Sequence, residues 1–157
     1  MKEKSMNQTT VAEPIPEGFH TVSPFLIAKD AVKFLEFIKK AFNGETISLL
    51  KQSDGKVMHA SARIGDSIIL VTDFMEKMEP LKSMLYLYVE DVDDMYERAI
   101  EAGAQSIREP RNEFYGDRSA GVKDAWGNHW WIATHIEDVD REEIKRRATE
   151  FEKTNKN

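Results

Sequence analysis

FLIAKDAVKFLEFIKKAFNGETI (25–47) has a counterpart of the same pattern in YLYVEDVDDMYERAIEAGAQSI (86–107). In each copy a short apolar strand leads to an aspartate, Asp30 or Asp91, which is a good helix N-cap. The two aspartates lie 61 residues apart. Apolar residues at helical spacing follow each aspartate, and a glycine is then expected to take the left-handed position that ends the helix. The agreement of these signals indicates a duplicated strand–helix unit.

Three further strand-like runs follow each predicted helix. In the first half they are ETISLLKQ, KVMHASARI and SIILVTDF, and in the second half AQSIREP, SAGVKD and NHWWIATH. The turns SDG (53–55) and IGDS (64–67) are good hairpin signals. The sequence therefore predicts the order βαβββ twice, with MEKMEPLK (75–82) as the connection.

The composition limits the class of protein. With 157 residues, of which 41% are hydrophobic, the chain is long enough for one core of ordinary size and indicates a single domain. The net charge is −6 and no basic patch is present, which argues against nucleic acid and membrane as partners. The absence of cysteine excludes disulfides and thiolate chemistry. No apolar run is long enough to span a bilayer, so we expect a soluble cytoplasmic protein.

Three segments are predicted along the chain. Residues 1–18 are polar, contain two prolines and are expected to form a mobile tail. Residues 19–136 form the domain, with module one at 19–74 and module two at 83–136. Residues 137–157 form a C-terminal helix and tail.

The C-terminal helix is predicted to begin at Asp140, which with Glu143 has the pattern of a capping box. Its apolar residues form one narrow stripe, namely Ile144, Ala148 and Phe151. Such a stripe fits a helix that docks weakly on the domain or on a partner subunit. A helix surrounded by solvent is the alternative.

Alternation of side chains along the strands predicts which residues face a pocket. If Gly65 and Asp66 form the tip of the hairpin, one face is uniformly apolar and suits packing under a helix: Ala60, Ala62, Ile69 and Val71. The opposite, mixed face is the pocket candidate: His59, Ser61, Arg63, Ile68, Leu70 and Thr72. In the second module the equivalent set is Met84, Tyr86, Tyr88, His129, Trp131, Ala133 and His135. The alternative is that these side chains fill a core and leave no usable cavity.

HASARIGDSIILVTD, YLYVEDVDDMYERAIEAGA and EFYGDRSAGVKDAWGNHWWIATH resemble the vicinal oxygen chelate superfamily, which contains glyoxalase I, bleomycin-resistance proteins and extradiol dioxygenases. Within it, the chain is similar to the PhnB-like branch, and the resemblance spans residues 20–138. It implies an α+β fold in which two βαβββ modules form a cup-shaped mixed sheet around a pocket, with the C-terminal helix added. Members are commonly dimers, and unpaired strand edges also favour a homodimer.

The resemblance also places the positions of the metal ligands used by some members. These positions, on the first and last strands of each module, hold Ser23, Leu70, Met84 and Trp131. None of them is a histidine or a carboxylate, and leucine and tryptophan cannot ligate a divalent ion. We therefore expect no metal and no cofactor.

The predicted ligand-binding residues are His59, Ser61, Arg63, Leu70, Met84, Tyr86, Tyr88, Tyr115, Arg118, His129 and Trp131. His59 is the candidate catalytic residue, as a general base or as a hydrogen-bonding selector, and a purely structural histidine is the alternative. Arg118, in the YGDR segment, can bind a ligand carboxylate or phosphate, or it can form a structural pair with Asp117 or Asp124.

These features predict a protein that binds a small, partly aromatic or apolar organic molecule in the cup without a metal. The alternative is a metal-dependent lyase or dioxygenase of the same superfamily that uses non-standard ligands. Whether any reaction is catalysed is left open by the sequence.

Overall fold

The computed structural model describes residues 11–77 and 80–155 of the chain. The elements follow the predicted order, which confirms an α+β fold of two βαβββ modules with a C-terminal helix. They are β1 (Phe25–Ala28), α1 (Ala31–Phe42), β2 (Glu45–Lys51), β3 (Val57–Ile64), β4 (Ser67–Asp73), β5 (Met84–Tyr88), α2 (Val92–Glu101), β6 (Gln105–Asn112), β7 (Asp117–Lys123), β8 (His129–His135) and α3 (Arg141–Thr154). Of the predicted tail and connection, residues 1–10 and 78–79 lie outside the described residues.

The strands form two four-stranded sheets of identical topology, β1-β4-β3-β2 and β5-β8-β7-β6. In each sheet the first and last strands of the module pair in parallel, and the other pairs are antiparallel. The hairpin register that the sequence predicts is confirmed, because Arg63 pairs with Ile68 and Ser61 with Leu70. The repeat in the sequence is therefore a repeat in structure.

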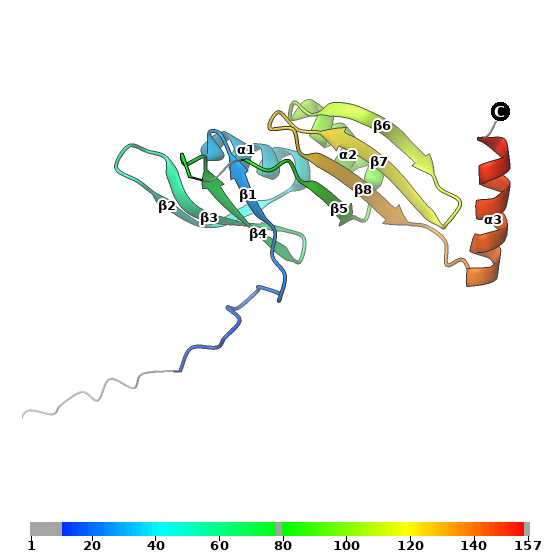
Figure 1. The fold of residues 1–157 in the computed structure, drawn as a ribbon, viewed down its shortest axis with the longest axis horizontal. Helices are drawn as coiled ribbons and strands as arrows, with labels where there is room; N and C mark the ends of the chain where they lie inside the picture. Colours follow the sequence, from blue (N-terminus) through cyan, green and yellow to red (C-terminus); the bar gives the residue numbers. More distant parts are fainter. Residues whose placement is uncertain (1–10, 78–79, 156–157) are drawn as a thin grey trace, which may run out of the picture.

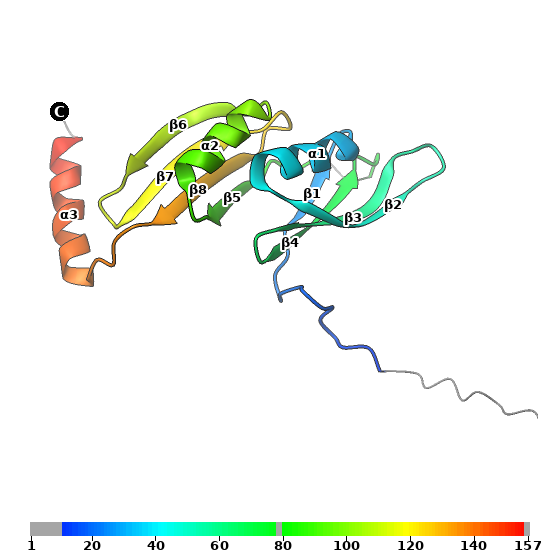
Figure 2. The same cartoon turned by 180° about the vertical axis from the view of Figure 1, so that it is seen from behind.

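Both helices lie on the same side of the molecule. Figure 2 shows α1 in front of the first sheet and α2 in front of the second, and Figure 1 shows the same sheets from the other side. We call the face of each sheet that turns away from its helix the open face. The predicted cup thus consists of two separate sheets, whose open faces lie side by side and do not oppose each other within one chain.

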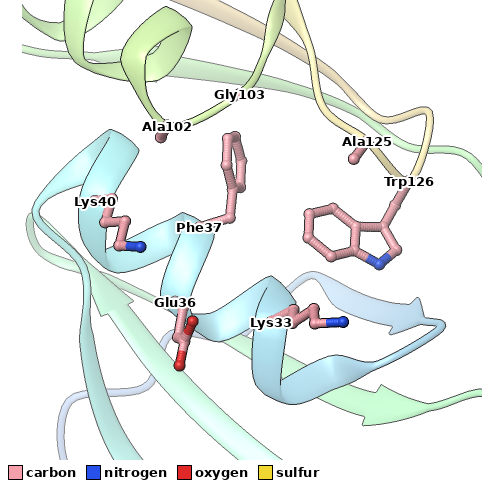
Figure 3. Close-up of a pocket in the computed structure, with 8 residues that line it drawn as sticks. All are labelled: Lys33, Glu36, Phe37, Lys40, Ala102, Gly103, Ala125 and Trp126. Carbon is pink, nitrogen blue, oxygen red and sulfur yellow. The ribbon is translucent and has the colours of Figure 1, made fainter.

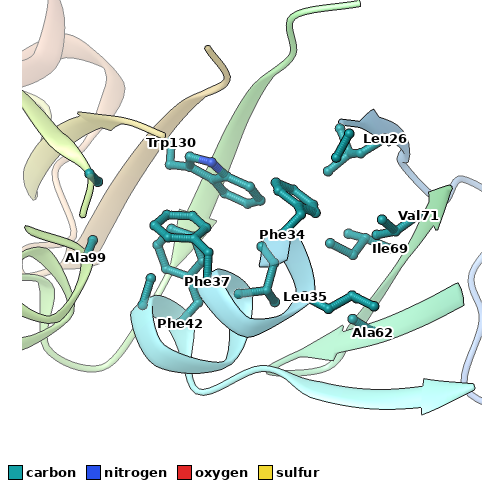
Figure 4. Packing of buried hydrophobic residues seen from close by; sticks show 14 of the residues in the cluster. Leu26, Phe34, Leu35, Phe37, Phe42, Ala62, Ile69, Val71, Ala99 and Trp130 are labelled. Carbon is teal, nitrogen blue, oxygen red and sulfur yellow. The ribbon is translucent and has the colours of Figure 1, made fainter. Parts of the chain in front are cut away.

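One hydrophobic core joins the two modules (Figure 4). Trp130 of β8 packs against Phe42 of α1, with ring centroids 4.6 Å apart. Trp126, in the turn before β8, meets Phe34 of α1 edge to face at 5.0 Å and donates its indole N–H to the Lys29 carbonyl oxygen. Aromatic rings of each module pack against the other, so the two modules share one hydrophobic core.

The predicted helix N-caps are confirmed, since the Asp30 and Asp91 carboxylates accept hydrogen bonds from backbone N–H groups in the first turns of α1 and α2. Gly103 has the expected positive φ of 105° after α2. At the end of α1 the prediction is wrong, because Asn43 takes the left-handed conformation, with φ 53°. Gly44 is required there for a different reason, since a Cβ would overlap the Ile38 side chain.

Helix α3 begins at its predicted N-cap, where the Asp140 carboxylate accepts from the Glu143 N–H at 3.0 Å. The Glu143 carboxylate does not complete a capping box but binds Arg146 and Arg147. Arg147 also binds the Glu137 carboxylate at 2.8 and 2.9 Å. Phe151 packs on Phe114 at 5.3 Å, and α3 has no fully buried residue. The helix is therefore docked on the end of the second sheet through a few contacts.

Candidate functional site

The open face of the second sheet carries an aromatic strip. Met84, Tyr86 and Tyr88 of β5 are 69%, 48% and 67% exposed, and Tyr86 pairs with Trp131 of the neighbouring strand β8. The tyrosine rings lie 5.3 Å apart. Within one chain these side chains do not fill a core. They form an accessible apolar surface with hydroxyl groups at its margin.

Arg108 of β6 places a positive charge directly over this strip. Its guanidinium carbon lies 4.7 Å from the centroid of the Trp131 ring, a cation–π geometry. The guanidinium is held by the Glu113 carboxylate at 2.7 Å and by the Ser119 hydroxyl. Gly121, which pairs with Trp131, gives the indole its room, because a Cβ there would lie 2.9–3.0 Å from ring atoms.

A hydrogen-bonded group of polar side chains adjoins the strip at the end of β8. Asp117 is buried, and its carboxylate accepts from the Tyr88 hydroxyl at 2.9 Å. Its other oxygen lies 2.7 Å from Nδ1 of His135, whose Nε2 lies 2.8 Å from the Asp138 carboxylate. The hydrogen bond to Asp117, followed by that to Asp138, raises the pKa of His135, which favours the imidazolium.

The tyrosine hydroxyls beside this group are held in their protonated form. Burial raises the pKa of Tyr86, and the neighbouring Tyr115 hydroxyl adds to the effect. The hydrogen bond to Asp117 is the main cause that raises the pKa of Tyr88. These hydroxyls are therefore hydrogen-bond donors at neutral pH.

The His135 contacts predict a pH-dependent stability. Because the folded-state pKa lies above the unfolded value of about 6.5, protonation of His135 contributes stability that is complete below that value. The contribution is lost as the pH rises through the folded-state pKa. We expect the difference in Tm between the natural protein and His135→Gln to be larger at about pH 6 than at about pH 9. Thermal unfolding measures it, with His129→Gln as the control. A difference that grows with pH would contradict the contacts.

The remaining predicted residues of the first module lie on the other open face. Ser61 of β3 is buried and shares a hydrogen bond of 2.7 Å with Ser48, and Arg63 lies 4.0 Å from Glu45. His59 is exposed. The structure therefore divides the predicted site into two parts. The first sheet carries His59, Ser61, Arg63 and Leu70. The second sheet carries Met84, Tyr86, Tyr88, His129 and Trp131.

Arg118 lies on the other side of the sheet from the predicted pocket. It pairs with Thr134 on the helix-facing side of the sheet, and its Nε and Nη2 donate to the Asp93 carboxylate at 2.7 and 2.8 Å. It thus ties β7 to α2 and lies away from the open face. Neither predicted carboxylate is its partner, because Asp117 binds His135 and Asp124 accepts from the indole N–H of Trp130. Tyr115, in the turn before β7, lies beside the open face through its interaction with Tyr86.

The positions that hold a metal in some members of the superfamily do not fit one in this chain. Leu70 pairs with Phe25, and the Trp131 indole lies under the Arg108 guanidinium. An indole offers no lone pair to a cation, and a leucine offers no donor atom. Across residues 11–77 and 80–155, no group of three His, Asp or Glu side chains is arranged to hold a metal ion.

A cleft of about 250 Å³ lies on the helical side, between α1, the end of α2 and the turn before β8 (Figure 3). Its lining residues are Lys33, Glu36, Phe37, Lys40, Ala102, Gly103, Ala125 and Trp126. None of the predicted site residues belongs to it. Because Trp126 is fixed there by its contacts with α1, the cleft marks the junction of the modules.

Sequence reasoning missed Arg108, Asp117 and Ser119 as parts of this surface, and it placed His135 on the pocket-facing side of its strand without giving it a role. The face of Arg108 could not be read from alternation, since the register of β6 shifts on both sides of it. A signal for Asp117 was available, because it begins the strand that pairs with the strand ending at His135.

In the described part of the chain, no helix is long and apolar enough to cross a membrane.

Comparison with known proteins agrees with this architecture. The model of the Glyoxalase/Bleomycin resistance protein/Dioxygenase superfamily matches residues 18–132. An uncharacterised protein of Mycobacterium bovis is 31% identical over 135 residues, covering 79% of this chain and 89% of that protein.

Two solved structures share the fold at lower identity. TioX from Micromonospora sp. has a TM-score of 0.62 at 20% identity, over 73% of this chain and 99% of that chain. A PhnB protein from Bacillus cereus has a TM-score of 0.60 at 14% identity, over 73% and 99%. With a family match over most of its length and a duplicated βαβββ fold, the chain belongs to the glyoxalase/bleomycin resistance protein/dioxygenase superfamily.

Proposed function

We propose that the protein binds a planar, partly aromatic organic molecule on the open face of the second sheet, without a metal ion. The observation that carries this proposal is the strip formed by the exposed Tyr86 and Tyr88 and the partly buried Trp131, with the Arg108 guanidinium above the indole. A contiguous apolar surface of this kind marks an interaction site in a soluble protein. Aromatic walls with few polar groups are typical of small-molecule sites.

The site is completed by a second copy of the chain in this proposal. Both open faces carry exposed apolar side chains, such as Phe25 at 48% and Leu50 at 55% on the first sheet and Met84 at 69% on the second. Because the two faces lie side by side, they cannot cover each other within one chain. A twofold axis places the first open face of one copy over the second open face of its partner and creates two equivalent cups.

Each cup then combines both halves of the predicted site. One copy supplies His59, Ser61 and Arg63, and its partner supplies the aromatic strip and Arg108. The ring of the ligand stacks between the sheets, and the positive charge of the two arginines favours a ligand that carries a carboxylate or phosphate. The residues at the metal-ligand positions of the superfamily include a leucine and a tryptophan, which supports a binding role more than the alternative of a metal-dependent lyase or dioxygenase.

The lack of cysteine fits a reducing compartment and supports a cytoplasmic location.

Sedimentation velocity with an absorbing probe tests ligand binding and assembly together. We expect 2-naphthoate to sediment with a species of twice 18.1 kDa, and chelation with EDTA to leave both the binding and the mass unchanged. Its uncharged analogue 2-naphthamide is expected to bind more weakly, because it lacks the charge that the arginines recognise. A probe bound to a single chain would contradict the assembly. Binding lost on chelation, together with release of a stoichiometric metal, would favour the metalloenzyme.

A further inference from the structure

A glycine brings together the two strand ends on which the polar group beside the aromatic strip depends. Gly116, in the turn before β7, has φ 99°, and a Cβ there would overlap the Glu137 carbonyl oxygen. The Gly116 carbonyl oxygen accepts from the Ile136 and Glu137 N–H groups at 2.9 and 3.0 Å. This close approach places Asp117, the first residue of β7, opposite His135, the last residue of β8.

The buried Asp117 fixes the orientation of the His135 ring. One carboxylate oxygen accepts a hydrogen bond from the Tyr88 hydroxyl, and the other is hydrogen-bonded to Nδ1 of His135. Both oxygens of the Asp117 carboxylate therefore have a partner. A carboxylate that accepts from Nδ1 sets the proton on that nitrogen and points Nε2 away from itself. The His135 side chain is half exposed, so its Nε2 can be reached from solvent.

The Asp138 carboxylate is the partner of His135 Nε2 in this structure, at 2.8 Å. Little else fixes the position of Asp138. Its side chain is fully exposed and lies in the connection between β8 and α3, which has no helical or strand structure. An exposed ion pair of this kind contributes little and exchanges easily with a competing anion. The contact thus shows that Nε2 of His135, on the solvent side of the ring, can bind a carboxylate.

We propose that His135, held by the Asp117 carboxylate to which the Tyr88 hydroxyl donates, is the anion-binding subsite of the open face, and that Asp138 occupies it until the carboxylate or phosphate of a ligand replaces it. The position of the ligand's ring rests on the proposed function, because Tyr88 belongs to both the aromatic strip and the polar group. The subsite narrows the ligand class to aromatic acids. It also gives the protein an internal competitor that lowers its affinity for weak anions.

A purely structural role for His135 makes a different prediction. If the residue only joined β8 to β7, removal of Asp138 would leave anion binding unchanged. If Asp138 competes with the ligand, Asp138→Asn frees Nε2 and strengthens the binding of anions. Glu142→Gln is the matched control, since it removes the same charge from an exposed carboxylate four positions later in the chain, which binds Lys145 at 2.9 Å.

Nuclear magnetic resonance of histidine-labelled full-length protein tests the subsite directly. The His135 signal is identified by its loss in His135→Gln and is followed as inorganic phosphate and then 2-naphthoate are added. We expect both probes to shift the signal, Asp138→Asn to bind each about fivefold more tightly than the natural protein, and Glu142→Gln to behave like the natural protein. His135→Gln is expected to lose at least about tenfold in affinity for 2-naphthoate, since a charge-assisted hydrogen bond is removed.

The two probes separate this proposal from the proposed function. A His135 signal that responds to neither anion in the natural protein or in Asp138→Asn overturns the subsite. Equal binding of 2-naphthoate and 2-naphthamide to every variant also overturns it, while the aromatic site stands. If phosphate shifts the signal and binds more tightly to Asp138→Asn, but neither naphthalene probe binds, the subsite stands and the proposed function is wrong.

Discussion

Trp131→Ala is expected to weaken the binding of 2-naphthoate by about 30-fold or more, which corresponds to about 2 kcal/mol. The indole is the largest ring of the strip and also the surface on which the Arg108 guanidinium rests, at 4.7 Å. Its removal takes away the stacking partner and leaves Arg108 without the ring that positions it. Because Trp131 is only partly buried, the loss of folding stability should be much smaller than for the buried Trp130.

Two variants show which part of the effect comes from which contact. Trp131→Phe keeps an aromatic surface and should retain most of the affinity for 2-naphthamide. Arg108→Met keeps the length of the side chain and removes the charge, so it should weaken 2-naphthoate and leave 2-naphthamide nearly unchanged. Fluorescence titration measures all of these affinities. An unchanged affinity in Trp131→Ala would remove the open face of the second sheet from the site.

Gly116→Ala is expected to lower the free energy of unfolding by about 3 kcal/mol or more. Two costs add at this position. The backbone has φ 99°, which side chains rarely adopt, and the new Cβ would overlap the Glu137 carbonyl oxygen. The turn must then move away from the end of β8, which separates Asp117 from His135.

Gly55→Ala is the matched control for this variant. Gly55 also has a positive φ, 86°, but a Cβ there meets no atom within 4 Å. Its cost of about 1 kcal/mol reports the backbone strain alone. Urea denaturation compares the two variants with the natural protein. If Gly116→Ala costs no more than Gly55→Ala, the contact between the two strand ends is not important for stability.

Much of the second-sheet surface could be predicted from local patterns. The repeat placed Leu70 and Trp131 at equivalent positions, and the structure has both on last strands that pair in parallel with the first strands of their modules. Alternation along β5 assigned Met84, Tyr86 and Tyr88 to one face correctly, because a strand without a bulge keeps its period of two. Strand β6 has register shifts, and there alternation could not find Arg108.

The charged residues show the limit of this reasoning. Arg118 was expected near the pocket, and the structure turns it to Asp93 on α2, 25 positions earlier in the chain. Asp117 and His135 are 18 positions apart and meet because a glycine lets two turns come close. Such pairs depend on how distant segments are placed and leave no periodic signal in the sequence.

The sequence by itself determined the duplicated modules, the helix starts, the hairpin register and the apolar side of each sheet, because each of these follows from neighbouring residues and from the period of the backbone. Only the tertiary structure decided that the two open faces lie side by side and that Asp117, Tyr88 and His135 form one group. The packing of α1 against α2 places the two open faces side by side. The close approach of Gly116 to Glu137 brings the residues of the polar group together. Both are contacts between segments far apart in the chain, which local propensity does not specify.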